Sequence, residues 1–376
     1  MRLAFYAPMK SPDHPVPSGD RRMARLLQKA LKRAGHEVTL ASEFRSFEGK
    51  GDPARQEALR MEGEAEAARL IEKWRAEPEN MPEGWFTYHL YHKAPDWIGP
   101  VVARTLGIPY FVAEASHAPK RAKGPWAMGY EAAEKAIRDA QRIFHMTRLD
   151  GECLAPLAKY ADTLVYLPPF LDTDAFDAEA IPVDIAPEIL AAGGAADKHT
   201  LLSVAMMRHG DKLQSYQALA LSLTHLARSD WQLLVIGDGE AEAEVRECLK
   251  PLGPCVAYLG RRALEELPAW YSAADLYVWP AVNEAYGMAF LEAGASGLPV
   301  VACRLRGVPD VVREDETGLL VSPEDPMAFA GAIESLLGDA KRRAGMSAAA
   351  RNFVRQERTL DHAAAILKVE IGRGAA

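Results

Sequence analysis

Short apolar segments alternate with longer amphipathic ones along most of the chain. The first, Arg2–Ala7, has the length of a buried strand and is followed by a loop rich in Pro, Ser and Gly. Apolar residues then recur at helical spacing over Arg21–Ala34, and Gly35 stands where a helix would end. Glu37–Ala41 is a second apolar segment. The start of the chain therefore predicts a βαβ unit.

The same alternation continues to the middle of the chain and restarts after it. Further strands of the first half are predicted at Trp85–His89, Pro109–Ala113, Arg142–Met146 and Thr163–Leu167. Strands of the second half are predicted at Leu201–Met206, Trp231–Ile236, Val256–Leu259, Leu276–Trp279, Pro299–Ala302 and Gly318–Val321. Strands separated by helices favour parallel sheets that are covered on both faces.

We therefore expect an α/β protein with two doubly wound, Rossmann-like domains. A proline-rich segment around Pro168 and Pro169 separates them, so that the first spans 1–170 and the second 171–356. Ligands of such folds bind at the carboxyl ends of the strands, and we expect them where the two domains face each other.

The amino-acid composition is that of a globular protein and excludes several other classes. Of the 376 residues, 49% are hydrophobic and 26% charged, which excludes a disordered or collagen-like chain. The 44 basic and 52 acidic side chains give a net charge of −8, so no nucleic-acid partner is expected. No apolar run approaches the roughly 18 residues of a spanning helix. Met1–Ala7 reaches Pro8 too soon for a signal peptide, so we expect a cytoplasmic protein.

The strongest chemical candidate follows the strand predicted at Leu276–Trp279. Glu284 falls in the loop after this strand, Gly287 at the start of a helix and Glu292 inside that helix. The backbone N–H groups at this start belong to Gly287, Met288 and Ala289. They and the positive end of the helix attract an anion, and the carboxylates can accept hydrogen bonds from a polyol. The alternative is a solvated glutamate pair beside an ordinary helix start.

Basic side chains and glycines follow neighbouring strands. Arg208 and Lys212 come directly after Leu201–Met206, where fixed cations would hold a diphosphate. Gly237 ends the next strand in a tight turn, and Arg261 follows a third. Gly237 lies in a Gly-Asp-Gly sequence that lacks the third glycine of a dinucleotide-binding motif. We expect these loops to line one cleft.

On these residues the second half resembles the nucleotide-sugar domain of retaining glycosyltransferases of family 4, also called group 1, which have the GT-B fold. The likeness covers about 201–323, and its signature is the glutamate pair with seven residues between the two. It implies that Glu284 contacts the transferred sugar and that Glu292 binds the ribose. It also implies that Arg208 and Lys212 hold the diphosphate.

The first half is less similar to the family. Ser18 and Gly19, after Pro17, resemble its glycine-rich loop, whose backbone approaches the donor phosphate or the acceptor. His117 resembles a histidine that contacts the donor sugar, and a loop histidine bonded to backbone is the alternative. A final helix within about 357–376 is expected to pack back on the first domain, as such tails often do in this fold.

Other polar residues of the first half have less defined roles. Those expected to line the acceptor side, to cap strands or to pack in the core are His89, Tyr91, His92, Lys93, the loop 118–124, Trp126 and Tyr130. His89, His92 and His117 could ligate zinc, but their spacing is unconvincing. An Asp-x-Asp sequence at Asp172 is explained by a turn. No metal site is expected.

The first predicted helix is basic on its exposed side. Its cations are Arg21, Arg22, Arg25, Lys29, Lys32 and Arg33. A solvated surface is the favoured interpretation, and peripheral binding to the inner face of an anionic membrane is the alternative.

Together these features predict a retaining, metal-independent transferase without a cofactor. It would move a hexose-type sugar from a nucleotide-diphosphate sugar, such as a UDP or GDP sugar, to a glycan, lipid or small molecule. The alternatives are a non-catalytic sugar-nucleotide-binding protein and a GT-B epimerase or phosphorylase, the last of which needs a lysine for a pyridoxal cofactor. The sequence indicates no oligomeric state.

Overall fold

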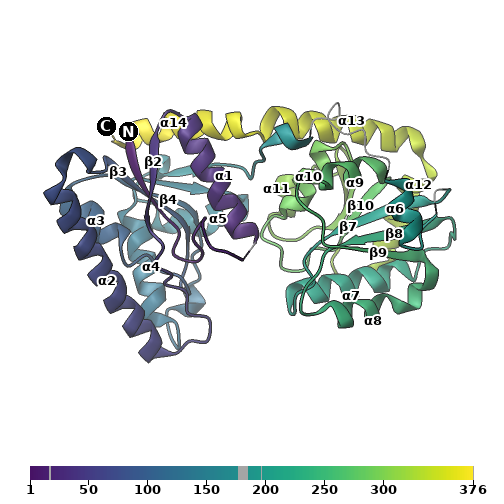
Figure 1. The fold of residues 1–376 in the computed structure, drawn as a ribbon, viewed down its shortest axis with the longest axis horizontal. Coiled ribbons are helices and arrows are strands. Elements are labelled where there is room, and N and C mark those ends of the chain that lie inside the picture. Colours follow the sequence, from purple (N-terminus) through teal and green to yellow (C-terminus); the bar gives the residue numbers. More distant parts are fainter. Residues whose placement is uncertain (17, 177–184, 196, 376) are drawn as a thin grey trace. The chain divides into compact units, whose positions relative to one another are not determined.

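A computed structural model describes residues 1–16, 18–176, 185–195 and 197–375. The chain divides into two compact units. Unit 1 consists of Met1–Pro168 and the residues from Leu360 onward, and unit 2 of Pro169–Thr359. Each unit contains one parallel sheet with helices packed around it (Figure 1).

Within its described residues, unit 1 has a six-stranded sheet of order β2-β1-β3-β4-β5-β6 in which each neighbouring pair is parallel. The strands are β1 (Arg2–Tyr6), β2 (Glu37–Ser42), β3 (Gly84–Leu90), β4 (Tyr110–Ala115), β5 (Arg142–His145) and β6 (Leu164–Tyr166). The α-helices are α1 (Gly19–Arg33), α2 (Pro53–Ala76), α3 (Gly99–Leu106), α4 (Ala127–Asp139), α5 (Arg148–Leu154) and α14 (Leu360–Ala375). The 3-10 helices are η1 (Pro78–Asn80), η2 (Pro119–Arg121), η3 (Ala155–Leu157) and η4 (Ala161–Thr163).

The core of unit 1 forms because β1, β3, β4 and β5 are largely buried on both faces by apolar side chains. Trp85 of β3 is fully buried and meets Trp74 of α2 edge to face, with ring centroids 6.4 Å apart. The helix α14 packs against α1 and β5. It buries one side of itself there through Ala363, Ala364, Leu367 and Ile371.

Within its described residues, unit 2 has a six-stranded sheet of order β12-β11-β10-β7-β8-β9, again with parallel neighbours. The strands are β7 (His199–Val204), β8 (Trp231–Ile236), β9 (Val256–Gly260), β10 (Leu276–Trp279), β11 (Val300–Cys303) and β12 (Gly318–Val321). The α-helices are α6 (Ala186–Ala191), α7 (Asp211–Leu223), α8 (Glu242–Leu249), α9 (Leu267–Ala273), α10 (Met288–Ala295), α11 (Val308–Val311), α12 (Pro326–Gly338) and α13 (Ala340–Glu357). The 3-10 helices are η5 (Thr173–Phe176) and η7 (Lys250–Cys255). The helix α7 packs against α8 and α12, and α10 packs against α9 and α13.

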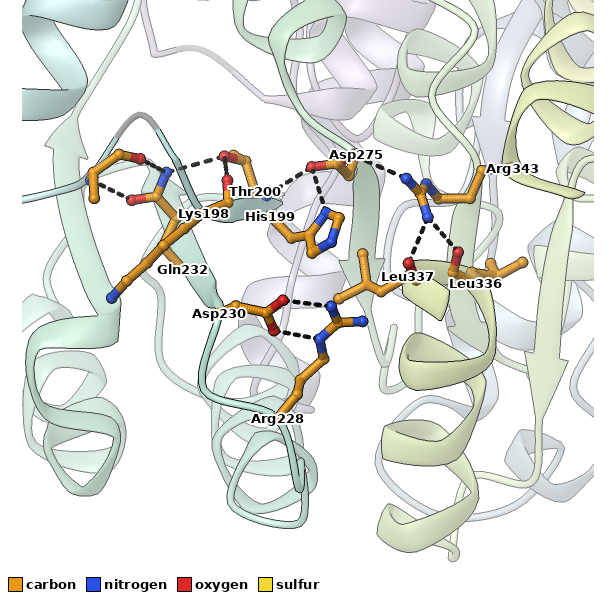
Figure 2. A network of polar contacts seen from close by, with 11 residues as sticks. Lys198, His199, Thr200, Arg228, Asp230, Gln232, Asp275, Leu336, Leu337 and Arg343 are labelled. Carbon is orange, nitrogen blue, oxygen red and sulfur yellow. Dashed lines mark hydrogen bonds and ion pairs between the residues drawn. The ribbon is translucent and has the colours of Figure 1, made fainter. Parts of the chain in front are cut away.

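A network of polar contacts joins the amino ends of β7, β8 and β10 (Figure 2). Asp275, just before β10, accepts a hydrogen bond from the Thr200 N–H at 2.9 Å and lies 3.6 Å from the guanidinium of Arg343. Gln232 of β8 donates to the hydroxyl of Thr200 at 3.0 Å. Arg343 also donates to the last carbonyls of α12. The side chains at this edge of the sheet thus tie strands and helices to one another.

The predicted strands are confirmed. The bounds of β8, β10 and β12 are those that the sequence predicts, and the other strands agree to within two residues at each end. Among the described residues, no helix is both long enough and apolar enough to pass through a lipid bilayer.

Candidate active site

The strand order of unit 2 reverses at β7. From there β8 and β9 extend to one side of the sheet, whereas β10, β11 and β12 extend to the other. Doubly wound folds bind ligands outside the carboxyl ends of the strands at such a reversal. Arg208 and Lys212 follow β7, and Glu284 and Gly287 follow β10. Four of the predicted residues therefore flank the point at which this architecture places a ligand.

Lys212 and Glu284 form the central ion pair of this edge. Lys212 Nζ donates to Glu284 Oε2, and the two side chains are 27% and 22% exposed. The same ammonium lies 5.6 Å from the ring centroid of Trp279, the last residue of β10. Trp279 is in turn packed edge-on against Tyr216 of α7, with centroids 4.9 Å apart. The pair is thus held by packing on one side and accessible to solvent on the other.

Hydrogen bonds between the loop after β10 and the first turns of α7 create this pair. The Val282 N–H donates to Ser215 Oγ at 2.9 Å, and the Asn283 side-chain amide donates to Asp211 Oδ1 at 3.0 Å. The Ser215 hydroxyl also donates to the Asp211 carbonyl. The loop is therefore fixed against the helix that carries the lysine.

Gly287 allows the loop to turn into α10. Its φ is +81°, and a Cβ on it would lie 2.7 Å from Phe290 Cδ2 and 3.2 Å from Glu284 Cγ. No side chain caps α10 at Gly287. Met288 and Ala289 begin its first turn, whose N–H groups have no partners inside the helix. This helix start can donate to an anion.

Glu292 lies inside α10 and is only 3% exposed. Its Oε2 accepts a hydrogen bond of 2.8 Å from the Tyr271 hydroxyl of α9, which orients the carboxylate. Burial, followed by the nearby charges of Glu292 and Glu284, raises the pKa of Tyr277 well above its usual value. No sequence motif marks Tyr271, because its role depends on how α9 packs against α10.

Glycines after β8 let two strand-end loops lie in backbone contact. A Cβ on Gly237, whose φ is +150°, would lie 1.9 Å from the Ala205 carbonyl oxygen, and one on Gly239 would lie 2.2 Å from that of Met207. The loop after β7 that carries half-buried Arg208 is therefore fixed by its neighbour. Gly237 has a clear packing role at this edge, and its contact with a donor remains a prediction.

Arg261 directly follows β9 and is exposed. Its neighbour Arg262 instead pairs with Glu188 at 2.6 Å and lies over the ring of Trp270. Arg262 is thus part of the packing of unit 2. Arg261 is instead exposed to solvent at the carboxyl edge of the sheet, where Lys212 and Glu284 also lie.

Ser18 and Gly19 lie at the start of α1 in unit 1. Ser18 is its N-cap, and its hydroxyl accepts a hydrogen bond from the Arg21 N–H at 3.2 Å. A Cβ on Gly19 would meet nothing within 4 Å. Pro17, which precedes them in the proposed glycine-rich loop, lies outside the described residues. The Ser18 hydroxyl therefore has a structural role, and backbone contact with a substrate remains a prediction.

The basic side chains of α1 contact other parts of unit 1. Arg21 donates to the His14 carbonyl at 2.8 Å, and Arg25 donates to that of Pro12 at 2.7 Å. Arg33 pairs with Asp361 of α14 at 2.6 Å. These guanidinium groups thus help to hold the loop before α1 and the helix α14.

His117 follows β4, and its ring faces α4. Its Nε2 lies 2.9 Å from the Tyr130 hydroxyl and 3.6 Å from Glu134 Oε2, and the two rings stack. A hydrogen bond to Glu134, together with burial, raises the pKa of Tyr130 to about 12. The partner of His117 is thus a side chain and not the backbone considered as the alternative.

A second group of titratable side chains lies where the strand order of unit 1 reverses, between β1 and β3. His89 Nδ1 is 3.0 Å from Asp20 of α1 and 3.9 Å from Glu114 of β4. Burial by itself would lower the pKa of His89, but the charges of Glu114 and Asp20 raise it to about 9. Burial raises the pKa of Glu114 to about 7. His89 therefore lies between two carboxylates, and its place on the acceptor side remains a prediction.

Comparison with known proteins bears directly on unit 2. Residues 198–339 match the family model described as glycosyl transferases group 1. The D-inositol 3-phosphate glycosyltransferase of Corynebacterium diphtheriae is 46% identical over 95 residues, which are 25% of this chain and 22% of that protein. Its counterpart in Xylanimonas cellulosilytica is 31% identical over 261 residues, 63% of this chain and 58% of that one.

The matched part of unit 2 is therefore similar to the group 1 glycosyltransferases. The structure of Anabaena HepE in complex with UDP is similar in fold, with a TM-score of 0.76, 16% identity and coverage of 99% of this chain and all of that one. The expected α/β class with two Rossmann-like domains of GT-B type is thereby confirmed. The aligned part spans less than two thirds of the curated relatives above.

The family match covers much of unit 2, which holds most of the predicted site residues. There the structure brings Lys212 and Glu284 into contact and places Gly287 beside them. Ser18, Gly19 and His117 belong to unit 1. The roles of all these residues toward a substrate remain predictions.

Proposed function

We propose that the protein is a glycosyltransferase that uses a nucleotide-diphosphate sugar as donor and transfers a hexose-type sugar to an acceptor bound by unit 1. The donor binds at the carboxyl ends of β7 and β10. The observation that carries this proposal is the juxtaposition of Lys212, Glu284 and the uncapped start of α10 at the strand reversal of unit 2.

The cations and the helix start stabilise the leaving diphosphate. As the bond from the sugar to the diphosphate breaks, negative charge grows on the phosphate oxygen. Arg208 and Lys212 neutralise this charge, and the N–H groups at Gly287 and Met288 donate to it. Lys212 exchanges its contact with Glu284 for the diphosphate, which leaves the Glu284 carboxylate available to a sugar hydroxyl.

Glu292 binds the ribose of the donor. Because Tyr271 holds one of its oxygens, the carboxylate is oriented before the nucleotide arrives. Gly237 and Arg261 complete the donor side, with Arg261 near the base. In unit 1 we place His117 toward the sugar and Ser18 and Gly19 toward the phosphate or acceptor. The acceptor hydroxyl attacks the anomeric carbon on the face from which the diphosphate leaves, and a leaving phosphate oxygen takes the hydroxyl proton, so that the configuration is retained.

A nucleotide panel tests donor binding. We expect UDP or GDP, and the matching sugar nucleotide, to raise the melting temperature by mass action. Transfer or slow hydrolysis of the bound donor would support the enzyme. Binding without turnover would favour a non-catalytic sugar-nucleotide-binding protein, and conversion of the donor into its epimer would favour an epimerase.

Chelation tests whether a metal takes part. Two fixed cations and a helix start suffice in this proposal to neutralise the diphosphate, so turnover should persist after treatment with EDTA. Loss of turnover that is restored by added Mg²⁺ or Mn²⁺ would contradict metal independence, while leaving donor binding by unit 2 in place.

A further inference from the structure

We propose that unit 1 contains a phosphate-binding site, the basic cluster, formed by His92, Lys93, Lys120, Arg121 and Trp126. We further propose that the phosphate it binds is a monoester group of the acceptor, a step that rests on the proposed function. The family match at 198–339 does not include any of these residues.

Two loops bring the cluster together at the carboxyl ends of neighbouring strands. His92 and Lys93 follow β3, whereas Lys120, Arg121 and Trp126 follow β4. The Lys93 ammonium and the Arg121 guanidinium lie 4.9 Å and 4.8 Å from the ring centroid of Trp126. The His92 ring meets Trp126 edge to face at 5.9 Å. The indole thus gathers three nitrogen-bearing side chains around it.

The cluster contains buried polar atoms without partners. Among the described residues, neither ring nitrogen of His92 has a hydrogen-bond partner, nor do Arg121 Nε and Trp126 Nε1, although all four atoms are buried. An unpaired buried donor costs about 1–3 kcal/mol, and few occur in folded proteins. Four such atoms on touching side chains indicate that a ligand normally completes the site.

The charges of the cluster are of one sign. Among the described residues, no carboxylate lies within 4.0 Å of Lys93, Lys120 or Arg121. Burial, and then the positive charges of Arg121, Lys93 and Lys120, lower the pKa of His92 to about 4. This contrasts with His89, three residues earlier, whose partners are carboxylates. The missing ligand is therefore an anion.

Phosphate fits this donor set best. Three cations exceed what a single carboxylate needs, and they match a phosphate monoester, which carries close to two negative charges at neutral pH and three exposed oxygens. Arg121, Trp126 and His92 can each donate to a separate oxygen. Because the unpaired nitrogens are buried, the flat surface of a membrane cannot reach them, and only a small anion around which these side chains rearrange can do so. We therefore assign the phosphate to a soluble acceptor.

Site-specific NMR on the full chain tests the site. The protein is saturated with UDP, so that the donor side of unit 2 is filled, and is titrated with inorganic phosphate and with glycerol phosphate at pH 7. The Trp126 indole and His92 ring signals are assigned with Trp126→Phe and His92→Gln. We expect both signals to shift in a saturable manner. The double variant Lys120→Ala/Arg121→Ala should weaken phosphate binding about tenfold or more.

A control variant and a lipid titration distinguish binding at the basic cluster from a nonspecific effect of charge. Lys135→Ala removes an exposed charge further along α4 and should leave phosphate affinity unchanged. Absence of any Trp126 or His92 shift would overturn the proposal, as would equal weakening by Lys135→Ala. A response only to anionic phosphatidylglycerol vesicles would overturn it in favour of a lipid surface. Because the readout is local, it stands even if UDP does not bind and the proposed transfer fails.

Discussion

Polar side chains at the two edges of the unit 2 sheet differ in what they contact. At the amino edge, Asp275, Thr200, Gln232 and Arg343 bond to one another and to helix carbonyls, so that each contact links two structural elements (Figure 2). At the carboxyl edge, the Lys212 and Glu284 pair is partly exposed, and α10 begins without a side-chain cap. One edge stabilises the sheet, and the other presents groups that a ligand can bind.

Backbone strain is also concentrated at the carboxyl edges of the sheets. The non-glycine residues with positive φ at or just beyond the carboxyl ends of strands are His89, Glu114, Ala281, Asn283 and Arg306. Such conformations cost of order 1–3 kcal/mol each and persist only where their surroundings impose them. In both units, therefore, stability is given up at the edge where the candidate functional residues lie.

Replacing a carboxyl-edge cation should have the largest effect. Arg208→Ala is expected to lower transfer by about 10²–10³-fold, since it removes a preorganised charge from the leaving group, while the melting temperature stays unchanged. Arg228→Ala is the control: it breaks the exposed pair with Asp230 at the other edge and should cost less than about 1 kcal/mol of stability and no activity. Wild-type turnover in folded Arg208→Ala would contradict the proposed site.

Alkaline pH should weaken unit 1 at its carboxyl edge. The pKa of His89 rises from 6.5 to about 9 on folding, so its contribution is complete below pH 6.5 and lost as the pH rises through 9. That of Glu114 rises from 4.5 to about 7, so the loss that it adds has the same direction but falls between pH 4.5 and pH 7. We expect the free energy of unfolding to fall by on the order of 3 kcal/mol between pH 6 and pH 9, mostly through His89.

Denaturant titrations at the two pH values measure this loss. His89→Gln should flatten the dependence above pH 6.5, because the titrating imidazole is gone. His36→Gln, a change to a histidine for which burial lowers the pKa, is the control and should keep it. An equal slope in wild type and His89→Gln would show that other groups cause the pH dependence.

Breaking the amino-edge network should affect stability alone. Asp275→Ala removes the acceptor of the Thr200 N–H and the carboxylate beside Arg343, which keeps its bonds to the α12 carbonyls, and is expected to cost about 1–3 kcal/mol in the free energy of unfolding. Turnover per folded molecule should stay within a factor of two or so of wild type, because this edge lies away from the candidate site. If fully folded Asp275→Ala had a lower kcat than wild type, the amino edge would also contribute to activity, and the proposed difference between the two edges would be wrong.

Removing one hydroxyl should give the smallest effect. Tyr271→Phe deletes the hydrogen bond to Glu292 and should weaken nucleotide binding by about three- to tenfold, with little change in stability. Calorimetry with the nucleotide diphosphate measures it. Because Tyr271 acts through Glu292, Tyr271→Phe should have no further effect on binding in a Glu292→Ala background; an additive loss would instead indicate direct contact with the nucleotide.

The alternation of apolar segments was sufficient to predict the strands. The residues of β8 and β10, for example, are mostly apolar, whereas the segments on either side of them contain polar residues. The contact between Lys212 and Glu284 could be expected, because the two residues follow β7 and β10, and the carboxyl ends of parallel strands lie at the same edge of a sheet. The sequence could not indicate that Asp20 would meet His89, because that contact depends on β1 lying beside β3. The docking of Val282 on Ser215 likewise depends on tertiary packing and leaves no local signal.

The helix α14 has a consequence for the order in which the protein can fold during synthesis. A ribosome makes unit 2 as one continuous stretch, yet α14, which packs against α1 and β5, is translated only after all of it. Unit 2 can therefore complete its tertiary structure first, although unit 1 begins the chain. Until α14 emerges, nascent unit 1 lacks the cover that Leu367 and Ile371 provide, and the apolar surface beneath them stays open to water.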